Sequence, residues 1–132
     1  MTLDIKLKTP LLPLGVDEKK GLDILQSYSS QIIKEIDEDI TNYRVDTDEF
    51  DIAIYVKDSK VIAVWYNDPL GRDSEEGIKS KLELYKIRYG RQEDWKLTIN
   101  NGWMEFYTNE AEKLQIVYGI HQDVIRINLL TK

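Results

Sequence analysis

The sequence predicts an α+β fold in which a mostly antiparallel sheet of about seven strands packs against two helices, in one domain over residues 1–132. Three observations support this prediction. Two stretches place apolar residues at helical spacing, several shorter stretches alternate apolar and polar residues, and turn residues separate the strands in pairs. Helices and strands follow one another unevenly, which favours an antiparallel or mixed sheet over a parallel one.

The first two elements are expected before residue 41. Alternating apolar and polar residues predict a strand over residues 3–7, ended by Thr9-Pro10. From about Asp17 to Ile40, apolar residues recur at three- and four-residue spacings and predict an amphipathic helix. Gly21 and the pair Ser29-Ser30 weaken this helix, so two shorter helices are the alternative.

A hairpin is expected over residues 50–66. Residues 50–56 alternate as a strand, and Asp58-Ser59 turns the chain. Val61, Ala63 and Trp65 are then expected on the same face as the apolar residues of the first strand. Because the opposite face is apolar as well, we expect this hairpin near the centre of the sheet.

The second helix is expected from about Glu75 to Tyr89. Ser74 is a typical N-cap residue, and Ile78, Leu82 and Tyr85 begin an apolar stripe along the helix. Gly90 follows the last residue of the stripe, at the position where glycine commonly ends a helix.

Two further hairpins complete the predicted sheet. Asn101-Gly102 predicts a tight turn between strands over residues 95–100 and 103–108. Residues 114–120 and 124–130 predict the last pair of strands.

The register of these hairpins bears on function. A two-residue turn at Asn101-Gly102 pairs Ile99 with Met104, which places Trp103 and Tyr107 on the face away from the apolar side of the hairpin. In the last hairpin the same alternation sorts the side chains into an inward set, Tyr118, Ile120, Ile125 and Ile127, and an outward set, His121, Arg126 and Asn128.

If the two hairpins are neighbours, Trp103, Tyr107, Arg126 and Asn128 share one surface. Trp, Tyr and Arg are the residue types enriched at the energetic centres of protein interfaces. The alternative is that the first helix covers this face and both aromatic side chains belong to the core.

Acidic residues are concentrated in one stretch, Glu35 to Asp51, where eight carboxylates against Arg44 give a net charge of −7, while the whole chain has a net charge of −6. Three of the carboxylates are expected near the C-terminal end of the first helix, where negative charge opposes the helix dipole. We therefore expect this stretch to contact a basic partner. The candidate binding residues are Asp37, Glu38, Asp39, Asp46, Asp48, Glu49 and Asp51, together with Trp103, Tyr107 and Arg126.

No motif for catalysis or for a cofactor is present. His121 and Asp123 could supply two metal ligands, or a base and its orienting carboxylate, but the sequence supplies no third member. The chain has no cysteine, no nucleotide-binding glycine loop and no nucleophile elbow, and Asp46 to Lys57 departs from a calcium loop at its sixth and twelfth positions. We therefore expect no enzymatic activity, no metal and no cofactor.

Charge and hydropathy limit the partners. An acidic chain is a poor ligand for nucleic acid, and the lysines of the second helix are expected to form a solvated face. No apolar run approaches the ~20 residues that span a bilayer, and the N-terminus lacks the apolar core of a signal peptide. We expect a cytoplasmic protein; its oligomeric state is not predicted.

Small, acidic and cysteine-free, without a catalytic constellation, the chain resembles the bacterial immunity proteins of contact-dependent growth inhibition and other polymorphic toxin systems. The resemblance is one of profile over the whole chain. It implies a cognate toxin domain, often a basic nuclease, that is neutralised in a stoichiometric complex. Two alternatives stay open: a small structural, adaptor or phage-related binding protein, and a carboxylate-based enzyme.

Overall fold

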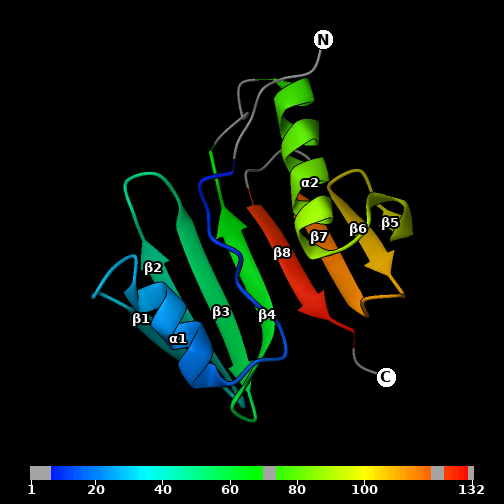
Figure 1. The fold of residues 1–132 in the computed structure, drawn as a ribbon. Helices are drawn as coiled ribbons and strands as arrows, with labels where there is room; N and C mark the ends of the chain where they lie inside the picture. The colour runs from blue at the N-terminus through cyan, green and yellow to red at the C-terminus, as the bar shows by residue number, and fades with distance from the viewer. Residues whose placement is uncertain (1–6, 70–73, 120–123, 131–132) are drawn as a thin grey trace.

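In the computed structural model, which describes residues 7–69, 74–119 and 124–130, the chain forms an eight-stranded antiparallel sheet with the strand order β1-β2-β3-β4-β8-β7-β6-β5. Both α-helices and the extended segment over residues 7–16 lie on one face of this sheet (Figure 1). The predicted α+β class is confirmed, and the described sheet has eight strands where about seven were expected.

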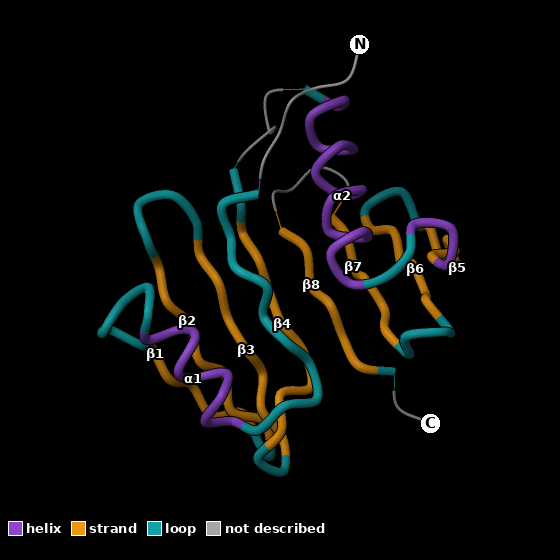
Figure 2. Tube along the Cα trace, in the orientation of Figure 1, coloured by secondary structure: helices purple, strands orange, loops and turns teal. Residues whose placement is uncertain are grey.

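Each half of the chain is a helix followed by a four-stranded meander. The first half contains α1 (Glu18–Gln26), β1 (Ile33–Asp37), β2 (Ile40–Asp46), β3 (Asp51–Lys57) and β4 (Lys60–Asn67). The second half contains α2 (Glu75–Tyr89), the short 3₁₀-helix η1 (Gln92–Asp94), β5 (Trp95–Asn100), β6 (Met104–Asn109), β7 (Leu114–Gly119) and β8 (Val124–Leu129). β4 pairs with β8, so the two meanders join in the middle of the sheet, and β1 and β5 form its edges (Figure 2).

The second helix and the first predicted hairpin lie where the sequence places them. The Ser74 hydroxyl caps α2 by accepting a hydrogen bond of 2.9 Å from the Gly77 N–H. Asp58 and Ser59 both adopt positive φ, +52° and +63°, as a two-residue turn between β3 and β4 requires.

The predicted helix over residues 17–40 is wrong beyond Gln26, because residues 33–46 form β1 and β2 instead. The Ser27 hydroxyl donates to the Ile24 carbonyl (2.6 Å) and the Ser29 hydroxyl accepts from the Gln31 N–H (3.0 Å), so serine side chains compete with the helical hydrogen bonds. The isoleucines that follow are β-branched and fit a strand better than a helix. The strand expected over residues 3–7 falls mostly outside the described residues, and Leu7 is not in a strand.

The register between β3 and β4 also differs from the prediction. A bulge near Tyr55 leaves Ile62 without a partner on β3, so Ile54 lies opposite Val64, and Ala53 lies opposite Trp65. Ala63 and Trp65 therefore point away from the helices, and the prediction that they share a face with Ile54 is wrong. Val61, opposite Val56, lies on that face as predicted.

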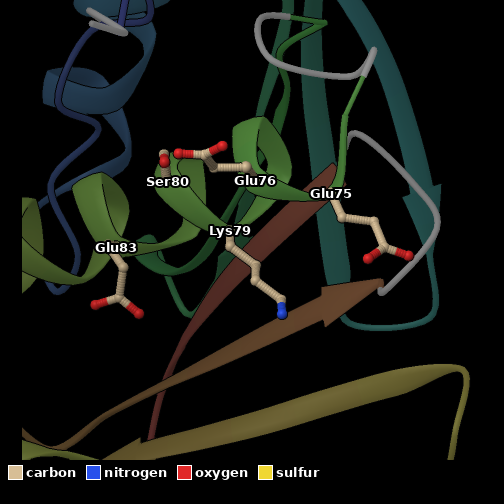
Figure 3. A pocket seen from close by; sticks show the side chains of 5 residues that line it. All are labelled: Glu75, Glu76, Lys79, Ser80 and Glu83. Carbon is tan, nitrogen blue, oxygen red and sulfur yellow. The ribbon is translucent and has the colours of Figure 1, made fainter. Parts of the chain in front are cut away.

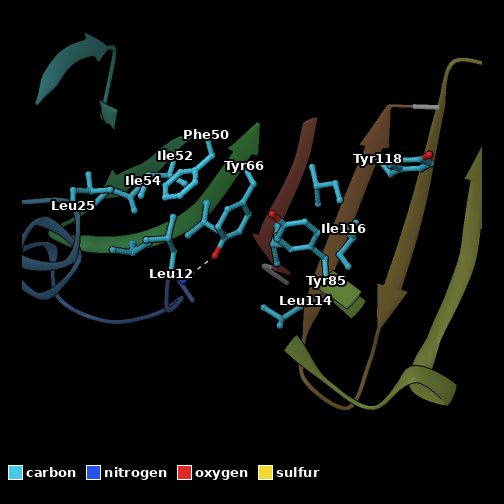
Figure 4. Close-up of a cluster of buried hydrophobic side chains, with 14 of the residues drawn as sticks. Leu12, Leu25, Phe50, Ile52, Ile54, Tyr66, Tyr85, Leu114, Ile116 and Tyr118 are labelled. Atoms are coloured by element: carbon cyan, nitrogen blue, oxygen red, sulfur yellow. Dashed lines mark hydrogen bonds between the residues drawn. The ribbon is translucent and has the colours of Figure 1, made fainter. Parts of the chain in front are cut away.

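The core lies between the sheet and the helix layer (Figure 4). Leu12 and Leu25 enter it from the helix side and pack against the apolar faces of β3 and β4. In the second half, α2 contributes Tyr85 above Ile116 of β7. The Tyr66 and Tyr85 rings, 4.8 Å apart between centroids, connect the two parts of the core.

A buried polar network holds the segment over residues 7–16 against the core. The Tyr66 hydroxyl accepts from the Leu12 N–H (2.8 Å), and the Tyr89 hydroxyl donates to the Leu12 carbonyl (2.7 Å). The Tyr85 hydroxyl lies 2.8 Å from that of Thr9, whose carbonyl accepts from Arg88 (2.9 Å). Burial is the main cause that raises the pKa of Tyr66, Tyr85 and Tyr89, which we call the tyrosine cluster.

Candidate interaction surface

The face of the sheet turned away from both helices, which we call the open face, is covered by no described helix or loop (Figure 1). Because side chains alternate along each strand, the strand pairing fixes which of them lie on it. They include Glu35, Asn42, Arg44, Asp46, Asp51, Tyr55, Trp65, Asn67, Phe106, Gln115, Val117, Arg126 and Asn128.

Three side chains near the middle of the open face form what we call the central cluster: Tyr55, Trp65 and Arg126. Arg126 lies directly opposite Trp65, and its guanidinium carbon is 4.3 Å from the centroid of the Tyr55 ring. This is a cation–π contact. The Arg126 Nε also donates to Asn128 Oδ1 at 2.7 Å, which holds the guanidinium in place. The Arg126 side chain is therefore positioned by contacts within the chain.

The strand positions opposite the cluster are filled by small residues. Ala53 lies opposite Trp65 and Ala63 lies opposite Tyr55, and each alanine is only 1% exposed although no described element covers this face. The larger neighbouring side chains shield them. Tyr55 and Trp65 are each half-buried, so part of each side chain remains accessible on this face.

An apolar row continues from the central cluster toward β5. Val117 lies opposite Arg126, Phe106 opposite Val117, and Ile99 opposite Phe106. Ile99 is 51% exposed. A contiguous apolar row on an uncovered face is typical of a site of protein contact.

The other side of the cluster is acidic, and we call Glu35, Asp46 and Asp51 the acidic flank. Asp46 and Asp51 lie directly opposite each other, an arrangement in which like charges repel. Arg44 contacts Asp46 through Nε (2.9 Å) and Nη2 (3.0 Å). Burial, followed by the charge of Asp46, raises the pKa of Asp51, so this carboxylate lacks full compensation within the chain.

The predicted acidic residues are divided between the two ends of β2. Asp37, Glu38 and Asp39 lie at the turn between β1 and β2, and Asp46, Asp48, Glu49 and Asp51 lie at the turn between β2 and β3. The seven residues of β2 separate these groups by about 20 Å. The prediction that the first group ends a helix is wrong, so the argument from the helix dipole does not apply.

Besides Asp46, two more of these carboxylates form exposed ion pairs. Lys57 Nζ lies 3.4 Å from Asp39, and Lys8 Nζ lies 2.5 Å from Glu49. Exposed pairs of this kind contribute about 0–1 kcal/mol each and leave the field of the acidic stretch largely in place.

Trp103 and Tyr107 do not lie on the open face. The Asn101 N–H donates to the Met104 carbonyl (3.3 Å), so the turn centres on Gly102 and Trp103, one residue later than predicted. The Asn101 side chain stabilises this turn by accepting from the N–H groups of Trp103 and Met104, both at 2.9 Å. With this turn and a bulge near Thr98, Tyr107 faces the helix layer, and the prediction that it shares a surface with Trp103 and Arg126 is wrong.

Each of these aromatic side chains has its own environment. Trp103 is 77% exposed in the turn between β5 and β6. Tyr107 is half-buried, with Lys86 Nζ 3.9 Å from its ring centroid and with its hydroxyl donating to Glu105 (3.1 Å). Burial, followed by the charge of Glu105, raises the Tyr107 pKa. Tyr107 therefore belongs to the contact between α2 and the sheet.

The predicted alternation of the last hairpin is confirmed where the structure describes it. Tyr118, Ile125 and Ile127 are buried on the helix side, and Arg126 and Asn128 lie on the open face. Ile120 and His121 lie outside the described residues.

An open depression runs along α2, lined by Glu75, Glu76, Lys79, Ser80 and Glu83 (Figure 3). All five side chains come from one helix, and Glu83 is already engaged by Lys86 Nζ at 3.0 Å and by Gln92. Within the part of the chain that the structure describes, no histidine lies beside Ser80 to act as a base.

Over residues 7–69, 74–119 and 124–130, no group of three or more histidine or carboxylate side chains is placed to hold a metal ion. No helix in the same ranges is long and apolar enough to cross a membrane.

Comparisons with known proteins add no assignment, because no family model, curated protein or solved structure matches this chain significantly.

Sequence reasoning placed Arg126 correctly and missed its two neighbours, Tyr55 and Trp65. The signal was present, because the hairpin over residues 50–66 is apolar on both faces although a sheet covered on one side needs only one apolar face. The bulge that turns Trp65 outward has no such signal, since no residue near Ile62 marks it.

Proposed function

We propose that this chain is a binding protein of the immunity type, which neutralises a cognate toxin domain of basic, nuclease-like character by forming a stoichiometric complex in the cytoplasm. The observation that carries this proposal is the open face, where the central cluster of Tyr, Trp and Arg lies beside a concentration of carboxylates.

The charge distribution supports a basic partner. Residues 33–51 contain eight carboxylates against Lys34 and Arg44, a net charge of −6, which equals the formal charge of the whole chain. These residues form one edge of the sheet and its turns, so the negative potential is one-sided. A one-sided field steers a basic domain into the right orientation, and clustered carboxylates resemble the phosphates that a nuclease binds.

The central cluster supports tight binding. Trp, Tyr and Arg dominate the energetics of protein interfaces, and side chains that are already ordered lose less entropy when a partner docks. Arg126 is held by Tyr55 and Asn128 before binding.

The alternative of an adaptor or phage-related binding protein would use the same face and differs only in its partner. An enzyme is less well supported. Asp51, whose pKa is raised by burial and by the charge of Asp46, lies on an open sheet face instead of in a cleft.

The test is to look for a toxin gene beside the gene for this chain and to co-express the two products. We expect the wild-type chain to restore growth and to form a 1:1 complex with the toxin domain. Changing Asp46, Asp48, Glu49 and Asp51 together to Asn or Gln should slow association several-fold at low salt and flatten its salt dependence.

The matched control neutralises four carboxylates of the other half, Glu75, Glu76, Glu83 and Glu93, and should change the association rate much less. The absence of both protection and a complex would contradict the proposed function. Equal effects of the two quadruple changes would mean that only net charge matters and that the acidic stretch does not direct docking.

A further inference from the structure

β1 is the edge strand of the acidic half, and no described strand pairs with its outer side. All five of its residues are exposed. We propose that the partner is held in part by strand addition, in which an extended segment with Lys or Arg at alternate positions pairs with the outer edge of β1. This inference rests on the proposed function, because it specifies how a basic partner is bound.

The backbone of β1 is arranged to receive such a segment. Asp37 and Ile40 flank the two-residue turn, so they form a hydrogen-bonded pair, and such pairs recur at every second residue of an antiparallel ladder. Glu35 and Ile33 therefore also direct their backbone groups toward β2. The N–H and C=O groups of Lys34 and Ile36 point outward, where an added strand would meet them.

The other edge of the sheet is protected in a way that β1 is not. In β5 the register shifts between Leu97 and Ile99, and the Thr98 hydroxyl donates to the Phe106 carbonyl at 3.1 Å. A bulge of this kind bends an edge strand and discourages pairing. β1, by contrast, keeps five consecutive pairs with β2 without a bulge.

The side chains of β1 indicate the chemistry of the segment. Glu35 and Asp37 lie on the open face two residues apart, whereas Ile36, which is 69% exposed, lies on the opposite face. Residues of an added strand would lie about 4.5–5.5 Å from them between Cβ atoms. Cationic side chains would then meet the two carboxylates, and an apolar side chain would cover Ile36.

Charge complementarity selects this occupant over a second copy of the chain. Two copies paired through β1 would bring two sets of these carboxylates together with the acidic turns of both molecules. A basic segment is attracted by the same groups.

The experiment uses the full chain and three capped ten-residue peptides at millimolar concentration: one alternating Lys and Val, one alternating Glu and Val, and one with five Lys followed by five Val. Amide hydrogen exchange is followed by NMR. We expect the alternating Lys peptide to slow exchange of the Lys34 and Ile36 amides at least about tenfold, because these N–H groups become hydrogen-bonded, and the other two peptides to leave them unchanged.

Variants separate strand addition from simple attraction. Lys34→Pro removes an outward N–H that the β1–β2 ladder does not use, and should abolish the protection at Ile36, whereas Lys34→Ala retains the N–H and should keep it. The double change Glu35→Lys with Asp37→Lys should reverse the preference, so that the alternating Glu peptide now protects β1.

Protection elsewhere, or shifts at carboxylates without protection of the β1 amides, would overturn the inference. An unchanged response of Lys34→Pro in a chain that retains the native β2 and β3 resonances would also overturn it. Because the peptides replace the toxin, failure of this experiment is distinguishable from failure of the co-expression test.

Discussion

The two halves of the molecule share one topology and differ in the surfaces that they present. Residues 18–67 carry eleven carboxylates against six Lys and Arg, a net charge of −5, whereas residues 75–129 carry nine against eight, a net charge of −1. The edge strand of the first half is regular and charged, and that of the second is bulged with Leu97 and Ile99 exposed. The shared topology therefore fixes where the core lies but not what the surface binds.

The helices of the two halves also meet the sheet differently. Gly21 of α1 lies so close to the sheet that an added Cβ would be 2.7 Å from Ile54 Cδ1, so this contact is close and apolar. α2 instead buries polar side chains, with Lys81 donating to the Asp68 carbonyl and Lys86 lying over the Tyr107 ring. In the first half, close apolar packing is joined by the Tyr43 hydroxyl, which donates to Glu18 of α1, and in the second half the helix also buries the charged side chains of two lysines.

The largest expected effect is at the junction between the halves. Tyr66 on β4 is fully buried, contacts Tyr85 of α2 and accepts from Leu12. Tyr66→Ala should lower the free energy of unfolding by about 3–5 kcal/mol, because it leaves a cavity and unpaired polar groups. Tyr66→Phe, which keeps the ring, should cost about 1–3 kcal/mol. Denaturant unfolding measures both changes.

The exposed Tyr28, at 42%, supplies the control for this comparison, and Tyr28→Ala should cost less than about 1 kcal/mol. If Tyr66→Ala instead produces two separate unfolding transitions, the halves are independent units and the junction does not couple them.

The next largest effect is on binding affinity, and it compares Trp65 on the open face with Trp103 in the turn between β5 and β6. Trp65→Ala should weaken the toxin complex by about 2 kcal/mol or more, because Trp65 lies in the central cluster. Trp103→Ala should cost less than about 0.5 kcal/mol of stability, because this side chain is 77% exposed. Calorimetric titration beside thermal melts gives both quantities. A greater loss of affinity from Trp103→Ala would move the interface to the turn of β5 and β6.

Much of the fold could be predicted from local sequence, because the relevant signals were unambiguous. Ser74 and Gly90 bound α2, and Asp58-Ser59 places the first hairpin, because serine caps helices with its hydroxyl, glycine commonly follows a helix end, and Asp and Ser are turn residues. The isoleucines at 32, 33, 36 and 40 fit both a helix and a strand. The pairing of β2 with β3, which local sequence does not reveal, decides in favour of strands.

The candidate surface was less predictable, because a shift of one residue reverses every side chain of a strand. The bulge near Ile62 turned Trp65 outward, and the displaced turn at Gly102 turned Tyr107 inward. Arg126 was placed correctly because its hairpin has no bulge.

High pH should weaken the junction more than either edge. The pKa values of the tyrosine cluster are raised in the folded state, so its stabilisation is fully present below the unfolded pKa of about 10 and is lost as the pH rises above it. Each such tyrosine can contribute up to about 1.4 kcal/mol per pH unit. Unfolding free energies measured between pH 9 and pH 11 should fall steeply, and Tyr85→Phe should reduce the slope. A slope that Tyr85→Phe leaves unchanged would mean that other groups control alkaline unfolding.

The smallest expected effect tests whether the charge of the first half serves binding or folding. The pKa of Asp51 is raised by burial and by Asp46, so the stabilisation linked to its protonated form is present below the unfolded pKa of about 4 and is lost as the pH rises through the folded pKa. Asp51→Asn should therefore stabilise the chain at pH 7, by about 0.5 kcal/mol or less, and this gain should vanish near pH 3. The amide can still accept the hydrogen bond from Asn67, and Arg44 retains its ion pair with Asp46.

Asp48→Asn in the exposed turn is the control and should change the melting temperature at neither pH. If Asp51→Asn destabilises the chain equally at both pH values, Asp51 serves the fold as a specific acceptor, and the acidity of this half would no longer require a basic partner to explain it.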